Sequence, residues 1–375
     1  MECDHAYSIQ LETPGQPYDI GGETDSLSVE EQAGRPSQLD VTVPDPERVM
    51  SHTIREGIPI QVALGSISDQ RLVFRGLVTQ VEGDFPEEGA PSLRITAHDQ
   101  RVRMGLKERS RHLRNQKLEQ LVQSVAEEYF LKSDVSVELD TDIDFGAQGV
   151  RQSRETDLRF LLRLAQQTEC QVLLETDGAS DKFRFVALSK LYRDKSRLAL
   201  TYQRDGVEHL LLSFKPRVDV GEVRLSKHRA AVDPESGNET TAVQAMAVPP
   251  AEEDIWLDEG LGRWFGRFPQ RTQQLSELQR ASIARAENVD LGAVAIDEAP
   301  PFLTGPQRAI LGKNVVARRL RGMRAEGRSV GLPGLRAGRM VNIQGVGRFS
   351  GDWYLTQVRH TVDGSGYHTE FECER

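Results

Sequence analysis

An internal repeat is the feature of this sequence that most restricts its fold. Residues 56–65, 74–81 and 92–99 read EGIPIQVALG, FRGLVTQV and SLRITAHD. Residues 337–347, 349–358 and 367–374 read AGRMVNIQGVG, FSGDWYLTQV and YHTEFECE. In both places a glycine precedes an alternating strand, a Phe-x-Gly turn begins a strand that ends in Thr-Gln-Val, and a third strand alternates again. The sequence therefore predicts the same small β-barrel twice.

Further short strands surround these two repeats. Runs with a period of two occupy 6–12, 26–32 and 38–44, and Gly, Pro and acidic residues separate them. Such spacing is typical of a barrel or a sandwich, and more strands are expected at 197–203, 209–216 and 221–228. A chain of 375 residues is long for one core, so two or three domains are expected.

Two helices and a hairpin lie between the repeats. Residues 115–131 carry the clearest apolar stripe in the chain, and residues 158–165 carry a second stripe behind an N-cap at Thr156. The run 170–176 then meets an Asp-Gly turn before an alternating run, which indicates a β-hairpin. Together these elements predict a small α/β unit from about residue 110 to 188.

The predicted fold is mainly β (α+β), with two β-barrels and a small α/β accessory domain. The predicted limits are 1–108 for the first barrel, 109–190 for the accessory domain and 191–375 for the second barrel. A polar, Pro-containing linker and a helix at 273–287 are expected to form an insertion in the second barrel at about 231–305.

Charge is distributed unevenly along the chain. The net charge is −10, and residues 231–260 hold eight acidic residues without a Lys or Arg, whereas residues 307–339 hold nine basic residues and one acid. We expect these two segments to meet, within or between subunits, with assembly that weakens at high salt. Aromatic and Arg side chains nearby are typical of interface anchors. The possible interface residues are Trp264, Phe265, Phe268, Arg318, Arg319 and Arg321.

No motif in the sequence predicts catalysis, a cofactor or a metal site. The alternating aspartates of the segment DTDIDFG fail as a calcium loop, because the required Gly and Glu are replaced by Phe145 and Arg151. His98, His360 and His368 lie on strands without an activated Ser or Cys motif, so we expect structural or surface roles. An acidic chain without aromatic and basic interleaving is not expected to bind nucleic acid stably.

Cysteine content and hydropathy indicate where the chain is made. Cys3, Cys170 and Cys373 are far apart and odd in number, which favours a reducing cytoplasm over a disulfide framework. No apolar run is long enough for a membrane span, and the N-terminus lacks the pattern of a signal peptide. We therefore expect synthesis in the cytoplasm and no membrane insertion.

Three segments together resemble the phage late control protein D family. They are residues 115–129, residues 155–178, and residues 332–375 with their order Gly-x-x-Val-x-Ile, Phe-x-Gly-x-Trp, His and Tyr-x-Thr. This family comprises tail hub proteins of contractile phage tails, with relatives in extracellular contractile injection systems and in the N-terminal half of the type VI secretion spike protein. The likeness is weakest between residues 233 and 306, where the acidic linker is longer than expected for the family.

The resemblance implies a non-enzymatic baseplate hub. It implies a homotrimer whose tube-like barrels, two in each chain, match the six-fold inner tube protein ring to the three-fold spike. The sequence ends directly after the last predicted strand, so we expect a separate spike protein, with other baseplate proteins as partners in an assembled virion or extracellular particle. Two alternatives remain open, a tail-tip cell-wall hydrolase and a carbohydrate-binding β protein. Turbidity loss of purified peptidoglycan would favour the first, and glycan binding by the monomer the second.

Overall fold

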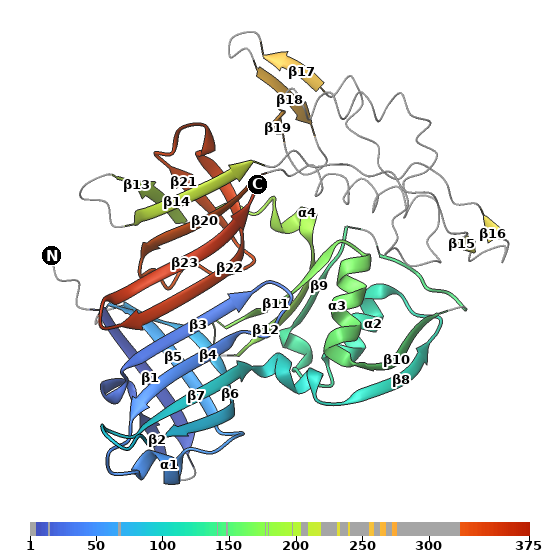
Figure 1. Ribbon diagram of the computed structural model, residues 1–375. Coiled ribbons are helices and arrows are strands. Elements are labelled where there is room, and N and C mark those ends of the chain that lie inside the picture. The colour runs from blue at the N-terminus through green and yellow to red at the C-terminus, as the bar shows by residue number, and fades with distance from the viewer. Residues whose placement is uncertain are drawn as a thin grey trace.

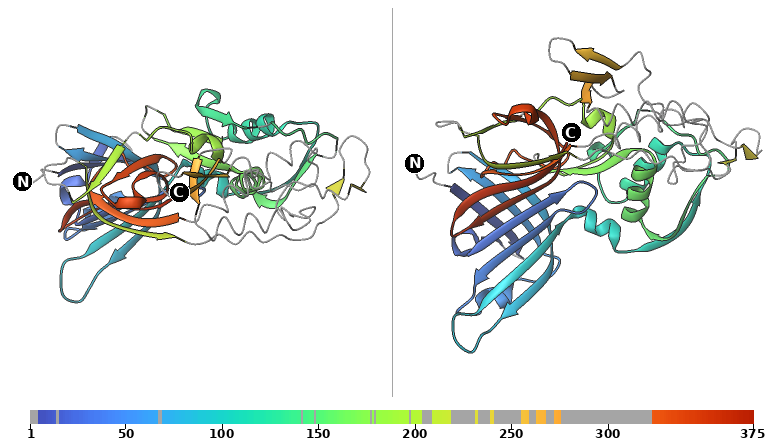
Figure 2. Two further views of the ribbon diagram at one scale, coloured as in Figure 1. Left: turned by 90° about the horizontal axis from the view of Figure 1, so that it is seen from above. Right: turned by 45° about the horizontal axis from the view of Figure 1, so that its top comes forward.

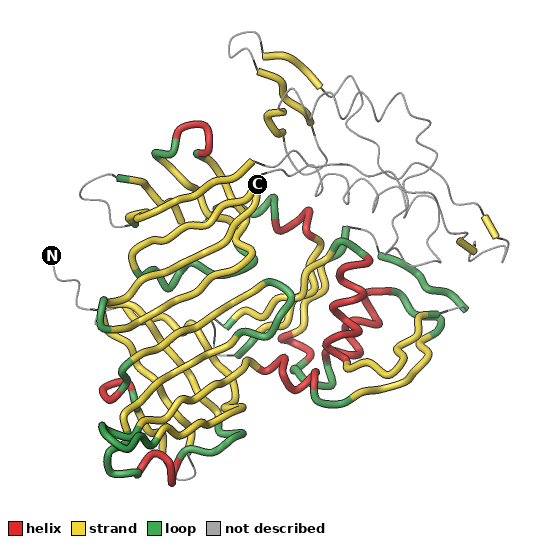
Figure 3. Tube along the Cα trace, viewed as in Figure 1, coloured by secondary structure: helices red, strands yellow, loops and turns green. Residues whose placement is uncertain are grey.

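The computed structural model describes most of the chain outside the predicted insertion. The described residues are 5–13, 16–66, 69–140, 142–147, 149–176, 178, 180–196, 198–203, 209–218, 231–232, 239–240, 255–258, 263–267, 272–275 and 323–375. They are mainly β, with two β-barrels and a smaller α/β part beside them (Figures 1 and 3).

The first barrel lies at the bottom of Figure 1 and is formed by the N-terminal strands. Its elements are β1 (His5–Thr13), β2 (Gln16–Asp19), η1 (Gly21–Glu23), β3 (Ser26–Gln32), β4 (Gln38–Pro44), α1 (Val49–Thr53), β5 (Pro59–Ser66), β6 (Asp69–Asp84) and β7 (Ser92–Asp99). Strands β3 and β4 alternate strictly between buried and half-buried side chains, as their sequences predict. The buried set includes Leu27, Val29, Leu39 and Val41, which face the barrel core.

The accessory part lies to the right of the barrels in Figure 1. Its elements are η2 (Gln100–Gly105), β8 (Glu108–Leu113), α2 (Leu118–Ala126), η3 (Lys132–Asp134), β9 (Val135–Glu138), β10 (Val150–Thr156), α3 (Asp157–Gln167), β11 (Cys170–Glu175), β12 (Lys182–Ala187) and α4 (Leu188–Leu191). The predicted N-cap is confirmed, since Thr156 Oγ1 accepts a hydrogen bond from the backbone N–H of Arg159 at 3.3 Å. The predicted hairpin is confirmed as the antiparallel pair β11–β12.

The second barrel lies at the top of Figure 1 and is closed. Its elements are β13 (Leu198–Tyr202), β14 (Leu210–Val218), β20 (Met323–Val330), β21 (Met340–Gln344), η5 (Gly347–Phe349), β22 (Gly351–Asp363) and β23 (Gly366–Glu374). Pairing runs in the order β22, β21, β13, β14, β20 and β23, and β23 pairs with β22 again. Trp353, Leu200 and Ile343 are fully buried in its core.

The repeat detected in the sequence folds into equivalent strands, β5–β6–β7 and β21–β22–β23. The register between the second and third strand of each set shifts at the threonine of the Thr-Gln-Val motif. Thr79 Oγ1 donates a hydrogen bond to the carbonyl oxygen of Thr96 at 3.2 Å, and Thr356 Oγ1 donates to that of Glu372 at the same distance. The shared motif therefore encodes a shared β-bulge.

The two barrels belong to one 13-stranded sheet, because β3 of the first pairs antiparallel with β22 of the second. The first part of β22 pairs with β21, and its second part, from Gln357 to Val362, pairs along β3. The right view of Figure 2 shows the second barrel above the first, with the accessory part to one side. The joint between barrels is therefore a continuous ladder of backbone hydrogen bonds.

One predicted element of the insertion is wrong at its start. The helix expected at 273–287 begins where the structure has strand β19 (Thr272–Leu275), which pairs with β18 (Arg263–Arg267). Pairing with a neighbouring strand overrides the local helical pattern there. The rest of that helix and the strand expected at 221–228 lie outside the described residues. The other described strands of this region are β15 (Ala231–Val232), β16 (Glu239–Thr240) and β17 (Ile255–Asp258).

Candidate assembly face

One side of the shared sheet is polar along its whole length. Eight strands follow one another in the order β14, β20, β23, β22, β3, β4, β7 and β6, and β20, β23, β22, β3 and β4 run down the front of the molecule in Figure 1. Buried and outward side chains alternate along β3, β4, β7, β20 and β23, as in β20, where Ala325, Gly327 and Ser329 are buried and Arg324, Glu326 and Arg328 face solvent. We call the outward side of these eight strands the assembly face.

A row of paired charges crosses the assembly face from one barrel to the other. In the ladder register, Arg328 lies opposite Glu370, Glu370 opposite Arg359, and Arg359 opposite Glu30. Arg359 Nε donates to Glu30 Oε2 at 3.0 Å, and this hydrogen bond raises the pKa of the Arg359 guanidinium. Exposed pairs contribute about 1 kcal/mol or less to stability, so their main effect is to favour one register of β3 on β22.

A groove of about 490 Å³ lies on this face in front of the second barrel. Its lining carries both signs of charge, and the charged residues are Lys215, Arg328, Arg359, Glu326, Glu370 and Glu372. Because acidic and basic side chains alternate, the groove offers no continuous basic track for a nucleic-acid backbone.

A buried arginine joins the three parts of the molecule behind this face. Arg336, between β20 and β21, forms an ion pair with Glu31 of β3, with Nε 2.7 Å from Oε1. Its Nη2 also donates to the carbonyl oxygen of Val73 in the first barrel at 3.1 Å and to Thr176 Oγ1 beside the accessory strand β11 at 2.6 Å. One guanidinium therefore contacts both barrels and the accessory part.

Two more ion pairs lie at the border between the first barrel and the accessory part. Arg101 Nη2 is 2.6 Å from Asp99 Oδ2, and both side chains are buried. Arg75 Nη1 is 2.9 Å from Asp181 Oδ1, and burial raises the pKa of Asp181 to about 6 although the Arg75 charge opposes this shift. The Arg75–Asp181 pair joins the first barrel to the accessory part, and Arg101 adds a contact from its Nη1 to the carbonyl oxygen of Val172 at 3.5 Å.

The buried nucleophilic and basic groups are placed for structure. Burial raises the pKa of the Cys170 thiol to about 12 and raises that of Cys373 well above its ordinary value, so both stay protonated at neutral pH. His360 is fully buried, and its Nε2 lies 3.0 Å from the carbonyl oxygen of Leu335, which can only accept. Nε2 therefore carries the proton, and Nδ1 accepts from the Tyr367 hydroxyl at 3.0 Å. Burial lowers the pKa of His360 to about 4.

The aspartates that spacing suggested for a calcium loop point to different partners. Asp144 Oδ1 accepts from the Gly146 N–H at 2.8 Å, and Asp142 Oδ1 accepts from the Glu119 N–H at 3.2 Å. Within the described residues, no group of three or more His, Cys, Asp or Glu side chains could hold a metal ion. No described helix is both long and apolar enough to cross a membrane.

The interface residues predicted from the sequence fall mostly outside the described residues. Trp264 and Phe265 lie in β18, which pairs with β17 and β19. The other four, Phe268, Arg318, Arg319 and Arg321, lie outside the described residues, as does most of the acidic segment. Their role at an interface stays a prediction.

The described part of the basic segment has partners elsewhere. Arg336 pairs with Glu31, while Arg324 and Arg328 lie opposite Glu374 and Glu370 of β23. Sequence reasoning missed the assembly face, although alternating charges in MRAEGRSV and YHTEFECE were a visible signal for it.

Solved structures of tail proteins share this fold. The tail protein from Neisseria meningitidis MC58 superimposes with a TM-score of 0.60 at 12% identity, covering 99% of this chain and 96% of its own. The 43 kDa tail protein of prophage MuSo2 from Shewanella oneidensis gives 0.55 at 13%, covering 99% and 97%. The E. coli c3393 protein, a type VI secretion system component, gives 0.58 at 13%, covering 97% and 76%. No curated protein sequence matches the chain.

The fold is thus that of tail and secretion-particle proteins. The sequence profile of the phage tail baseplate hub (GPD) family matches residues 30–289, which is more than half of the chain. The chain belongs to this family, and the resemblance seen in the sequence is confirmed.

Proposed function

We propose that this protein is the trimeric hub of a contractile tail or injection particle, joining the six-fold inner tube to a separate three-fold spike. The observation that carries this proposal is the joint between two barrels of equivalent strand order, made by β3 and β22. Two similar barrels in each chain, multiplied by three chains, give a ring of six. Membership of the baseplate hub family supports the same role.

The division of the chain follows from this role. We assign residues 1–108 and 191–375 to the two tube-like barrels and residues 109–190 to the accessory domain. The buried Arg336 contacts and the Arg75–Asp181 pair support a rigid protomer, since both join the accessory part to the barrels. A rigid protomer is what an adaptor needs, because the ring must present fixed rims to the tube and to the spike.

The assembly face is proposed to line the channel of the ring. Its charges alternate in sign, as in the row through Arg359 and Glu30, so a passing polymer or protein meets no strong single-sign field. The rims of the barrels would add to the first tube ring on one side and seat the spike on the other, with other baseplate proteins around them. The protein would be made in the cytoplasm and act in the assembled particle.

We also propose that the chain acts without catalysis. The family is a structural one, and the described cysteine thiols and His360 are buried with pKa values shifted toward their neutral forms. Such groups lack the exposure and activation that nucleophiles and general bases require.

Electron microscopy of the purified protein tests the proposed role. End-on views should show a ring of six lobes with three-fold symmetry and an open centre, since two barrels of each chain follow one another around it. Particles with two or four protomers, or rings without six lobes, would contradict the adaptor role.

A further inference from the structure

The joint inside the chain uses two defined strand edges. The second half of β22 has β23 on one edge and β3 on the other, whereas its first half has β21 in the place of β3. Strand β3 has β4 on its other edge. The outer strand of one barrel therefore adds to the exposed half of a long strand in the other barrel.

Equivalent edges exist at the two ends of the eight-strand order that forms the assembly face, on β6 and β14. Each barrel contains five strands that pair with their neighbours in the same order. This order is β5–β6–β7–β4–β3 in the first barrel and β21–β22–β23–β20–β14 in the second, and the strands also follow one another along the chain in the same way. Strand β6 is thus equivalent to β22, and β14 is equivalent to β3. The matched bulges at Thr79 and Thr356 fix the residue equivalence between β6 and β22.

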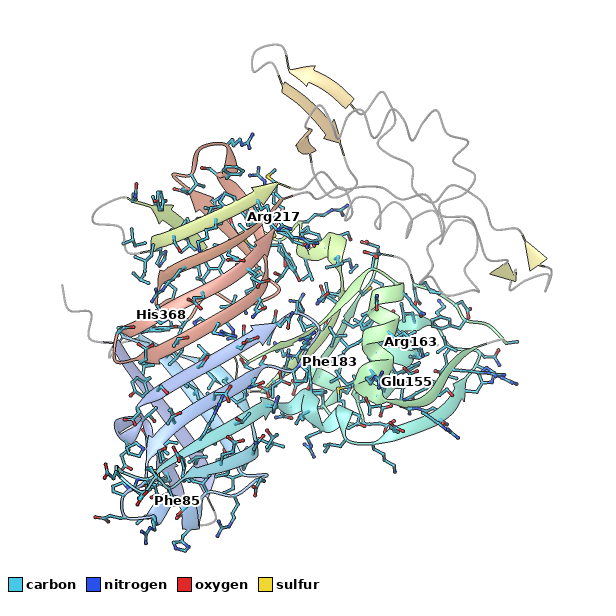
Figure 4. All side chains as sticks on the ribbon, viewed as in Figure 1. Phe85, Glu155, Arg163, Phe183, Arg217 and His368 are labelled. Atoms are coloured by element: carbon cyan, nitrogen blue, oxygen red, sulfur yellow. The ribbon has the colours of Figure 1, made fainter. Side chains whose placement is uncertain are left out.

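Both equivalent edges are unpaired within the described residues. Strand β5 pairs with β6 only up to Leu77, and backbone hydrogen bonds to this edge continue only to Val78. Strand β13 pairs with β14 only at Leu210 and Leu211. Figure 4 shows Arg217 of β14 on the upper barrel and Phe85, directly after β6, at the far end of the lower barrel. The two edges can therefore meet only between copies.

We propose that β14 of one copy adds antiparallel to the second half of β6 of the next copy, which repeats the β3–β22 joint between chains. This inference rests on the proposed trimeric hub and names the surfaces that would close it. The partner is a second copy of this chain, because each chain carries one edge of each kind and head-to-tail pairing closes into a ring.

Transfer of the observed register gives complementary charges at the new joint. Within the chain, Thr361 lies opposite Ser28 and Arg359 opposite Glu30. The threonine bulges make Thr361 equivalent to Asp84 and Arg359 equivalent to Glu82. The carbonyl groups that accept the threonine hydrogen bonds at the two bulges belong to Thr96 and Glu372, so these two residues are equivalent. The strand pairing leads from Thr96 through β4 to β3, and from Glu372 through β20 to β14. It makes Ser28 equivalent to Lys215 and Glu30 equivalent to Arg217. Lys215 would thus oppose Asp84 of the next copy, and Arg217 would oppose its Glu82.

The charge pattern favours this register. Inside one chain, a row of directly opposed residues runs from Glu374 through Arg324 to Arg217. Glu82 of the next copy would extend this row with the opposite sign. Pro216 would lie opposite Gly83, and since proline has no N–H the new ladder has at most one hydrogen bond fewer there. Phe85, which is 56% exposed, would gain cover from the added strand.

A thiol cross-link tests the pairing in the full-length chain. We would combine Asp84→Cys with Lys215→Cys in a Cys3→Ser background and add a short bis-maleimide, since Cys170 and Cys373 are buried. Directly opposed residues have Cβ atoms about 5 Å apart, so covalent dimers and a terminal trimer band are expected. The off-register pair Gln80→Cys with Lys215→Cys and each single variant serve as controls, and each should give at least about tenfold less trimer because directly opposed side chains are much closer.

The possible results separate this inference from the proposed function. Light scattering that finds trimers, together with a cross-link yield no higher than in the off-register control, would contradict only the β14–β6 pairing. A protein that stays monomeric at every concentration would contradict the trimer and the pairing together.

Charge reversal gives a second test that does not use cysteine. Lys215→Asp should weaken trimer formation about tenfold or more, and adding Asp84→Lys should restore it, because each trimer then contains the swapped pair. Lys132→Asp, an exposed change on the accessory part, should leave assembly unchanged. Equal assembly of the single and double variants would contradict the register.

Discussion

At the scale of single residues, buried polar side chains fix how the parts of the molecule meet. Arg336 contacts both barrels and the accessory part, and its carboxylate partner Glu31 is only 6% exposed. Sequence analysis counted Arg336 as one of nine basic residues in a segment, because nothing in the local pattern marks a side chain whose partners lie about 160 to 305 positions away. Long-range burial of this kind becomes visible only with the fold.

Arg336→Ala should destabilise the protein strongly. Removal of the guanidinium leaves Glu31 buried without its counter-ion, which typically costs about 3–5 kcal/mol. The free energy of unfolding in urea measures the effect. Arg359→Ala is the matched control, since its pair with Glu30 lies at the surface and exposed pairs contribute about 1 kcal/mol or less. Similar losses in both variants would contradict the buried joint.

The stability of the protein should fall in acid because of His360. Its pKa is about 4 in the folded protein and ordinarily 6.5, since burial disfavours the charged ring, with Glu31 opposing and Arg336 adding to this shift. Between pH 4 and pH 6.5, His360 is therefore protonated in the unfolded chain and neutral in the folded chain. The contribution is fully present above pH 6.5 and is lost as pH falls toward 4, by about 3 kcal/mol in total.

The variant His360→Gln isolates this contribution. Urea unfolding of both proteins between pH 7 and 4 should show a smaller decline for His360→Gln. Asp181, whose pKa is raised to about 6, acts with the opposite sign and adds stability as pH falls below 6, but it is present in both proteins and cancels in the difference. Parallel curves would contradict a buried neutral histidine.

At the scale of elements, the repeated Phe-x-Gly and Thr-Gln-Val motifs were the strongest guide in the sequence. Period-two alternation bounded by turn residues predicted the strands at 26–32, 38–44 and 92–99 with the observed limits, because both are local signals. The pairing of β3 with β22 could not be predicted, since it joins strands more than 300 residues apart and leaves no local pattern. The helix expected at 273–287 failed at β19 for the related reason that pairing overrides propensity.

Gly76→Ala should disturb the first barrel more than a glycine change elsewhere. A Cβ at Gly76 would lie 2.2 Å from the carbonyl oxygen of His98 in β7, and a backbone atom cannot move aside cheaply. We expect a loss of about 1–3 kcal/mol or more, as for other overpacked sites. Gly22→Ala is the control, because a Cβ there meets nothing within 4 Å. Thermal unfolding compares the two, and equal melting temperatures would contradict this reading of the motif.

At the scale of the whole molecule, two barrels with the same order of paired strands form a polar face that neither repeat alone contains. The joint, the shared bulges and the buried ion pairs all lie within one chain, and the proposed ring repeats the same joint between chains. The family and the two-barrel fold could be predicted from sequence, whereas the assembly face could not, because it depends on which strands become neighbours.

The absolute mass of the full-length protein in solution, measured by light scattering over a range of concentrations, tests the hub most directly. We predict a particle of three chains, each of 41.9 kDa, that persists on dilution into the low micromolar range. Such a mass follows from two equivalent barrels in each chain and a six-fold tube. A mass that stays at one chain at every concentration, or that settles at two or four chains, would contradict it.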